Sequence, residues 1–380
     1  MKTKFEVANT RLELLRYPPK QQHESLQAWD AADEYIIEYL QAEENDLNRP
    51  LSECNILLLN DNFGALACAL SSFKASSYSD SKVAAKGLLH NWQANFANTP
   101  LPQIMHSLQD VTSAYDLAIM KLPKSNDFLV ELLIHLRGIM PSGTLLISAG
   151  KANQISKNTL SLFEKHLGET KTSLAKKKSR LIFTRVDKTL SSQSKFPKTW
   201  AVEDSGIHMV NHANTFANSQ LDIGARLMLQ HLPDITNRNV VDLGCGNGVL
   251  GAHLLSGNPR NLHFVDESYM ALQSAKATVA SLSQVHAEVF YHHSNCLEDA
   301  DLPNISHIVC NPPFHQQNTI TDHIAWQMFA DSYHCLEKGG ELRVVGNRHL
   351  DYHHKMKRLF GGFKIVASNK KFVVISSSKR

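Results

Sequence analysis

Runs of apolar positions in the second half of the chain predict buried strands that alternate with short helices. Residues 240–241 end one such run, and residues 249–255 follow as a helix-compatible segment. Residues 262–267 predict a second strand that ends in carboxylates, and residues 305–310 predict another buried strand. Continuous apolar runs are typical of parallel strands that are buried on both faces. This order therefore predicts a doubly wound α/β domain.

The flanking segments complete this domain. Residues 289–291 and 341–345 predict two more strands, and residues 351–360 predict a basic helix. Residues 363–367 and 371–376 predict a terminal hairpin. Upstream, a helix is expected whose buried face consists of Leu221, Leu227 and Leu229.

A glycine-rich turn joins the first of these strands to its helix. Gly244, Gly246 and Gly248 occupy alternate positions, where the backbone must turn with little side-chain bulk. The dinucleotide pattern Gly-x-Gly-x-x-Gly fails when counted from Gly244, because its sixth place is Val249. Asp242 precedes the turn, where its carboxylate can reach the ammonium group of an amino-acid-bearing cofactor. An ordinary glycine-rich turn is the alternative interpretation.

Polar residues at the next two strand ends fit such a cofactor. Asp266 lies 20 residues after Gly246, the distance at which an acidic side chain meets ribose hydroxyls in these folds. Asp266 could also cap a helix that begins at Ser268. Asn295 follows the third strand and is expected to contact the adenine edge.

The segment Asn311-Pro312-Pro313-Phe314 ends the strand at 305–310 and has the composition of a clamp for a planar amino group. Its two prolines remove two backbone donors. The side-chain oxygen of Asn311 and the carbonyl of Pro312 can each accept one N–H from the amine, and Phe314 can stack on its ring. Catalysis would then depend on the positioning of the amine and on electrostatic stabilisation of the transition state. A strand-ending Pro-Pro turn is the alternative interpretation.

Together these two motifs resemble the class I amino-methyltransferases that use S-adenosylmethionine (SAM), and more closely the tandem-domain ribosomal RNA guanine-N2 methyltransferases of bacteria. Residues 26–35, 59–66, 347–352 and 369–374 resemble the large-subunit branch of that family. The expected cofactor-binding residues are Asp242, Gly244, Gly246, Asn247, Gly248, Asp266, Glu267, Asn295 and Cys296. The expected catalytic residues are Asn311, Pro312, Pro313 and Phe314.

The first half of the chain repeats the landmarks of the second half in the same order. Residues 56–66 parallel residues 240–250, but two of the three loop glycines are missing. Lys121 takes the place of Asn311, and Lys124 takes the place of Phe314. A lysine cannot accept N–H bonds from an amine. We therefore expect a non-catalytic copy that serves RNA docking or scaffolding, with a coincidental likeness of βαβ units as the alternative.

The predicted fold class is α/β, with two tandem doubly wound, Rossmann-like domains of the class I methyltransferase type. The degenerate copy is expected at residues 1–186 and the catalytic domain at residues 200–380. A polar, Ser-rich linker is expected at residues 187–199.

Length and composition limit the classes of protein to which the chain can belong. The chain has 380 residues, which fits two domains, and its six cysteines form no Cys-x-x-Cys pair. No apolar stretch approaches ~20 residues, so no membrane span is expected and the predicted location is the cytoplasm.

The net charge of +3 permits nucleic-acid binding without requiring it. The densest basic run, residues 176–180, could contact phosphates or form a solvated face. Histidine pairs at 292–293 and 353–354 lack metal-ligand spacing, so no metal is expected.

The predicted function is SAM-dependent methylation of the N2 amino group of a guanine in 23S ribosomal RNA, free or partly assembled. The same clamp also serves 16S guanine, adenine-N6 and protein glutamine-amide methylation. A non-catalytic rRNA-binding assembly factor is an alternative from another class. A NAD-linked oxidoreductase is disfavoured by the loop spacing.

Overall fold

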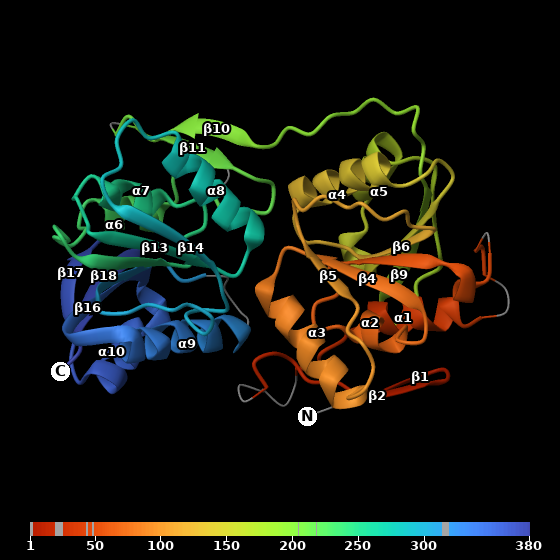
Figure 1. Ribbon diagram of the computed structural model, residues 1–380, viewed down its shortest axis with the longest axis horizontal. Coiled ribbons are helices and arrows are strands. Elements are labelled where there is room, and N and C mark those ends of the chain that lie inside the picture. Colours follow the sequence, from red (N-terminus) through yellow and green to blue (C-terminus); the bar gives the residue numbers. More distant parts are fainter. Residues whose placement is uncertain are drawn as a thin grey trace. The chain divides into compact units, whose positions relative to one another are not determined.

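The computed structural model describes residues 3–19, 26–42, 45–47, 49–203, 205–217, 219–313 and 319–380, with no description of the side chains of 319–322. The chain divides into two compact units, Met1–Lys195 and Phe196–Arg380. Each contains a seven-stranded sheet covered by helices on both faces (Figure 1). Within the described residues, no helix combines the length and the hydropathy needed to cross a bilayer.

The amino-terminal unit begins with a small hairpin and continues as an alternating α/β domain. Its strands are β1 Lys4–Val7, β2 Thr10–Glu13, β3 Asn55–Leu59, β4 Lys74–Ser79, β5 Gln103–His106, β6 Leu117–Lys121, β7 Leu145–Lys151, β8 Thr170–Thr172 and β9 Ser179–Arg185. Its α-helices are α1 Ala31–Leu40, α2 Ala65–Ala69, α3 Lys82–Asn95, α4 Asn126–Ile139 and α5 Lys157–His166.

The carboxyl-terminal unit has the same plan. Its strands are β10 Lys198–Ala201, β11 His208–Asn211, β12 Asn239–Leu243, β13 Asn261–Asp266, β14 Glu288–His293, β15 Ile305–Cys310, β16 Leu336–Asn347, β17 Lys364–Ser368 and β18 Phe372–Ser378. Its α-helices are α6 Ile223–Leu229, α7 Val249–Leu255, α8 Tyr269–Ala280, α9 Thr319–Cys335 and α10 Tyr352–Phe360.

The two large sheets have the same strand order. One runs β5-β4-β3-β6-β7-β9-β8 and the other β14-β13-β12-β15-β16-β18-β17. In the carboxyl-terminal sheet, β12 to β16 are parallel, whereas β18 is antiparallel to both β16 and β17. Order and direction of the strands therefore confirm both the duplication and the terminal hairpin predicted from the sequence.

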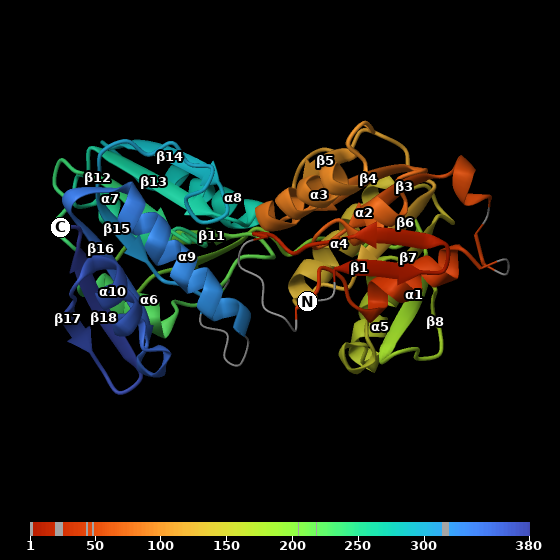
Figure 2. The ribbon, with the colours of Figure 1, turned by 90° about the horizontal axis from the view of Figure 1, so that it is seen from below.

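Helices cover both faces of the carboxyl-terminal sheet. Helices α6, α7 and α8 lie on one face, and α9 and α10 lie on the other (Figure 1). Figure 2 shows α9 and α10 in front of this sheet when it is viewed from below. The central strand β12 is buried along Val240 to Leu243, including the polar Asp242, as expected for a central parallel strand covered on both faces.

Helix α6 departs from the sequence-based expectation. Leu221, Leu227 and Leu229 are only partly buried against the core. The fully buried positions of α6 are Gly224, Ala225 and Met228. Small residues at two of these three positions let the helix backbone lie close to β16 and β18, against which α6 packs. The predicted face is therefore confirmed in part: its leucines pack against the core, but the most buried positions were not predicted, because the pattern of large side chains does not report a close approach of backbones.

Candidate active site

The glycine loop between β12 and α7 adopts backbone angles that favour glycine. Gly244, Gly246 and Gly248 have φ values of 68°, 55° and 80°. A Cβ atom on Gly248 would lie 2.8 Å from the Cβ of Ala275 in α8, so this position has no room for a side chain. At Gly246, no heavy atom of the described residues lies within 4 Å of a Cβ position. The loop is thus tightly packed at its helix end and open at its centre.

Asp266, at the end of β13, links this loop to the next helix. Its Oδ2 accepts a hydrogen bond from the backbone N–H of Gly246 at 2.8 Å, and its Oδ1 accepts one from Ser268 N–H at 2.9 Å. The N-cap of α8 is Ser268, whose hydroxyl accepts from Ala271 N–H. The alternative that Asp266 itself caps this helix is therefore wrong. Its contact with ribose hydroxyls stays a prediction.

Asp242 is buried inside the unit, with 1% of its surface exposed. Its Oδ2 accepts a hydrogen bond from Gly251 N–H in α7 at 2.8 Å. Burial raises the pKa of this carboxyl to about 7, the Gly251 bond opposes the rise, and the charge of Asp266 adds to it. One carboxylate oxygen thus has an internal partner, and the contact with a ligand's ammonium group stays a prediction.

The other predicted cofactor residues lie around the same loop ends. Asn247 is buried, and its Oδ1 accepts from Val249 N–H at 3.3 Å. Glu267 has an exposed side chain directly after β13. Asn295 is buried, and its Nδ2 donates to Glu298 Oε2 at 3.1 Å. Cys296 has a φ of 49°, and burial raises the pKa of its thiol. Their contacts with the cofactor stay predictions.

The clamp segment follows β15 directly. The Nδ2 of Asn311 donates to Asp222 Oδ2 at 3.5 Å, and within the described part of the chain its buried Oδ1 has no hydrogen-bond partner. Pro312 is buried and Pro313 is exposed. Phe314 lies outside the described residues, so its predicted stacking on the base cannot be placed.

Strand register brings these groups to one edge of the sheet. Leu243, the last residue of β12, pairs with Val265 of β13 and with Cys310 of β15. The glycine loop, Asp266 and Asn311 each follow one of these three neighbouring strand ends. Ligands of doubly wound sheets bind at this carboxyl edge, beside the central strand where the order reverses.

Two polar residues at this edge were missed by the sequence analysis. Asp222 is the N-cap of α6 and contacts Asn311, which lies 89 positions away in the sequence. Asn347 ends β16 opposite Phe372, is 7% exposed, and has an Oδ1 without a partner among the described residues. The Ser-Gln-Leu-Asp segment before α6 carried a capping signal that could have drawn attention to Asp222.

The amino-terminal unit has an ion cluster where the other unit has its clamp. Ile56 of β3 pairs with Leu117, and Val240 of β12 pairs with His307, so register places Lys121 at the position of Asn311. Lys121 Nζ lies 2.6 Å from Asp30 Oδ1 and 2.7 Å from Asp33 Oδ2. Burial lowers the pKa of Lys121, but the two carboxylates outweigh it and leave the pKa above its ordinary value. We call these three residues the Lys121 cluster.

When the two units are aligned by this strand register, further residues of the predicted site are replaced in the amino-terminal unit. Ser79 stands at the position of Asp266, and Leu58 at that of Asp242. Gly64 has a φ of 78°, close to the 80° of the corresponding Gly248, and Asn60 and Asn62 replace the other two glycines. This unit thus keeps the backbone turn at Gly64 and lacks the counterparts of Asp242, Asp266 and Asn311.

Comparisons with known proteins agree with this architecture. Residues 2–188 match the family described as the RLMG N-terminal domain, and residues 206–376 match the methyltransferase small domain. Ribosomal RNA large subunit methyltransferase G of Pseudoalteromonas atlantica is 47% identical, and that of Vibrio campbellii is 44% identical. These alignments cover 100% of this chain and 100% and 98% of the two relatives. The chain belongs to the ribosomal RNA large subunit methyltransferase G family.

A solved structure shares the fold of this methyltransferase G family member over its whole length. It is a 16S rRNA N2 methyltransferase of T. thermophilus in complex with AdoMet and guanosine, with a TM-score of 0.78 at 18% identity. The match covers 100% of this chain and 98% of the other. The expected family, the class I methyltransferase fold and an enzyme that depends on SAM are therefore confirmed.

Two of the four basic side chains in the run 176–180 form ion pairs within their own unit. Lys176 Nζ lies 2.7 Å from Glu38 Oε2, and Lys177 Nζ lies 2.6 Å from Glu34 Oε2. Both glutamates belong to α1. For Lys176 and Lys177, these exposed pairs favour the interpretation of the run as a solvated face over phosphate contact, which stays a prediction.

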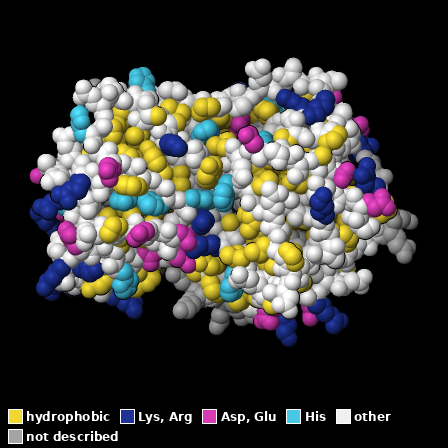
Figure 3. Space-filling model, in the orientation of Figure 1, with side chains coloured by type: hydrophobic (Ala, Val, Ile, Leu, Met, Phe, Trp, Pro, Cys, Tyr) yellow, Lys and Arg dark blue, Asp and Glu magenta, His cyan; other side chains and the backbone are white. Residues whose placement is uncertain are grey.

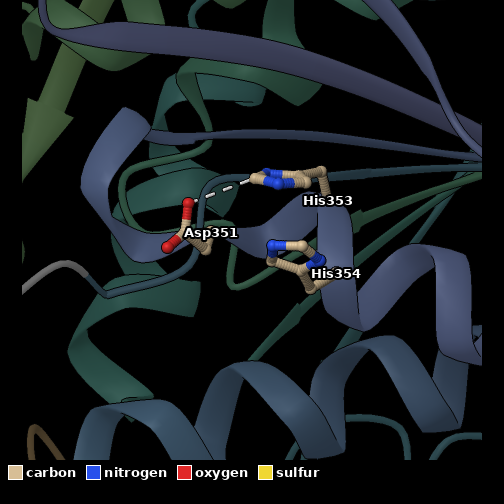
Figure 4. A group of neighbouring side chains, drawn as sticks. All are labelled: Asp351, His353 and His354. Carbon is tan, nitrogen blue, oxygen red and sulfur yellow. Dashed lines mark ion pairs between the residues drawn. The ribbon is translucent and has the colours of Figure 1, made fainter.

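One group of side chains among the described residues has metal-compatible spacing. Asp351, His353 and His354 lie at the start of α10, with one possible ligand atom of each within 4.8 Å of the others (Figure 4). Asp351 and His354 are exposed, and the His353 and Asp351 side chains approach only to 3.9 Å. Exposed groups at a helix N-terminus are common without an ion, and the expectation of no metal stays a prediction.

Proposed function

We propose that the carboxyl-terminal site transfers a methyl group from SAM to the N2 amino group of a guanine in 23S ribosomal RNA. One observation supports this proposal: the glycine loop, Asp266 and Asn311 lie at the carboxyl ends of three neighbouring parallel strands, at one edge of the sheet. A cofactor loop thus lies beside an acceptor for amine N–H groups. The large subunit is favoured by the full-length relatives at 40–47% identity.

The described residues fit a cofactor with a ribose and an amino-acid group. The open centre of the loop at Gly246 leaves space for close approach of a ligand to the backbone. Asp266 would hold the ribose hydroxyls and Asp242 the ammonium group. When bound, SAM supplies a methyl group activated by its sulfonium.

Asn311 and Pro312 would orient the guanine amine. Its lone pair is delocalised into the ring, which makes the nitrogen a poor nucleophile. The buried Oδ1 of Asn311 and the carbonyl of Pro312 would each accept one N–H and turn the lone pair toward the methyl group. The nitrogen can lose its proton after transfer, so no strong general base is required. Phe314 is proposed to stack on the base.

We propose separate roles for the two units. The carboxyl-terminal unit carries the chemistry, and the amino-terminal unit docks RNA or serves as a scaffold. The target base must leave its stack to reach Asn311. We therefore propose free or partly assembled 23S rRNA, in the cytoplasm, as the substrate.

Methylation of separated rRNAs tests this function. Tritiated SAM and the protein are incubated with 23S and 16S rRNA from a strain that lacks the enzyme, and the products are digested to nucleosides. We expect label in 23S rRNA, as N2-methylguanosine. The control is 23S rRNA from the parent strain, which should accept little label because its site is already methylated. Label in 16S rRNA or in adenosine would overturn the proposal.

A further inference from the structure

We infer that Asp222 is a positioning residue that sets the orientation of the Asn311 amide. This inference rests on the proposed function, because it concerns the same amine clamp. Asn311 serves an amine only if its oxygen, and not its NH₂ group, faces the substrate. The two ends of an amide have similar shape, so the surrounding structure must select one of them.

One oxygen of Asp222 determines which end of the Asn311 amide faces the substrate. Its Oδ2 accepts the backbone N–H of Ala225 at 3.0 Å, as the N-cap of α6, and the Nδ2 of Asn311 at 3.5 Å. A carboxylate only accepts hydrogen bonds, so it attracts the NH₂ end of the amide and repels the oxygen. This leaves Oδ1 of Asn311 for the substrate amine. The 3.5 Å separation is long, as is common for such bonds before a substrate is bound.

The absence of a side chain at Gly224 leaves room for this carboxylate. A Cβ atom at Gly224 would lie 2.9 Å from Asp222 Oδ2 and 3.2 Å from Cε1 of Phe372. Any larger residue at position 224 would therefore press on the oxygen that serves both Ala225 and Asn311.

The amino-terminal unit contains the corresponding contact. Asp30 caps α1, and its Oδ1 contacts Lys121 at 2.6 Å, at the position that corresponds to Asn311. Both units thus pair a helix-capping aspartate with the side chain that follows the same strand. In the amino-terminal unit a lysine replaces the amide, and the aspartate still receives N–H donors.

Two substitutions separate positioning from helix capping. Asp222→Asn keeps a carbonyl oxygen that can accept from both Ala225 and Asn311, whereas Asp222→Ser keeps a capping hydroxyl that is too short to reach Asn311. We expect Asp222→Ser to lower the single-turnover rate by ~10–100-fold, less than the loss of Asn311 itself. Asp222→Asn should stay within about threefold of the wild type. The SAM dissociation constant and the unfolding midpoint should change little in either variant.

A double mutant tests whether Asp222 acts through Asn311. In an Asn311→Ala background, Asp222→Ser should cause no further loss of rate, because the group that it orients is gone. Ser125→Ala, which removes the N-cap of α4 in the other unit, is the control for a lost cap and should leave the rate unchanged. Additive losses, an unchanged rate in Asp222→Ser, or a loss that lies only in SAM affinity would overturn the inference. If Asn311→Ala itself keeps full activity, the proposed function fails first, and the inference fails with it.

Discussion

At the scale of single residues, two carboxylates of the proposed active site accept hydrogen bonds from backbone amides of their own unit. Asp266 accepts hydrogen bonds from Gly246 and Ser268, and Asp242 accepts one from Gly251. Each therefore shapes the loop region as well as the ligand site proposed for it. Asp242 is also buried, and this burial raises its pKa to about 7.

The raised pKa of Asp242 predicts pH-dependent SAM binding. An ammonium group beside this carboxylate would favour its ionised form, so binding should release a proton below about pH 7 and affinity should rise from about pH 5 to about pH 7. Without ligand, the raised pKa contributes stability at acid pH that is lost as the pH rises through about 7.

Calorimetry in buffers of different ionisation enthalpy measures that proton release. Asp242→Asn should abolish it and flatten the rise in affinity, because an amide does not titrate in this range. Equal proton release by the wild type and by Asp242→Asn would show that Asp242 does not meet the ammonium group.

At the scale of elements, the Lys121 cluster joins α1 to β6 in the amino-terminal unit. The side chains of Lys121 and Asp33 are 8% and 6% exposed, so this ion pair is buried. A buried charge without its partner is costly, whatever the net contribution of the intact pair.

Lys121→Met should therefore destabilise the amino-terminal unit by ~3–5 kcal/mol. Urea unfolding followed by a probe in that unit measures this, and SAM affinity should stay constant. Lys124→Met is the matched control, because Lys124 is exposed and its replacement should change stability little. Equal unfolding midpoints for the two variants would contradict a structural role of the cluster.

The sequence predicts the residues that belong to local motifs better than it predicts contacts between distant parts of the chain. The glycine loop, Asp266 and Asn311 could be predicted because each belongs to a short local motif at a strand end. Asp222 could not be assigned to the clamp, because its contact with Asn311 joins positions 89 residues apart. The buried face of α6 was predicted only in part for a similar reason: two of its three most buried positions hold small residues, and their burial depends on the neighbouring strands.

At the scale of the whole molecule, the fold is duplicated but the proposed cofactor site is not. We therefore predict that each chain binds one cofactor. The amino-terminal unit lacks the counterparts of Asp242, Asp266 and Asn311. Titration calorimetry should give one SAM per chain, and Asp266→Ala should weaken that single site by ~1.5–3 kcal/mol, because hydrogen bonds to a charged group are removed. Two SAM per chain would show that the amino-terminal copy retains a site.

The RNA surface is predicted to lie close to the catalytic edge. Asn347 pairs with Phe372, so the turn containing Lys370 and Lys371 lies at the edge where β15 ends. Figure 3 also shows Lys and Arg side chains along the left-hand margin, where the carboxyl terminus lies in Figure 1; because β18 is antiparallel to β16, that margin is the opposite edge of the sheet from this turn.

Lys370→Glu with Lys371→Glu should lower the slope of log affinity for rRNA against log salt concentration, by about one unit for each phosphate that the protein no longer binds. The matched control is Lys176→Glu with Lys177→Glu, which should change the slope less because both lysines already pair with glutamates of α1. The opposite ranking of the two double variants would place the RNA surface on the amino-terminal unit.

The central claim is that Asn311, at the end of β15, orients the amine that receives the methyl group. Its most direct test is the single-turnover rate of methyl transfer to 23S rRNA by Asn311→Ala, at saturating RNA and SAM. We predict a fall of ~10²–10³-fold with nearly unchanged SAM affinity, because a preorganised acceptor is removed. An Asn311→Ala protein that methylates the RNA at the wild-type rate would contradict the account.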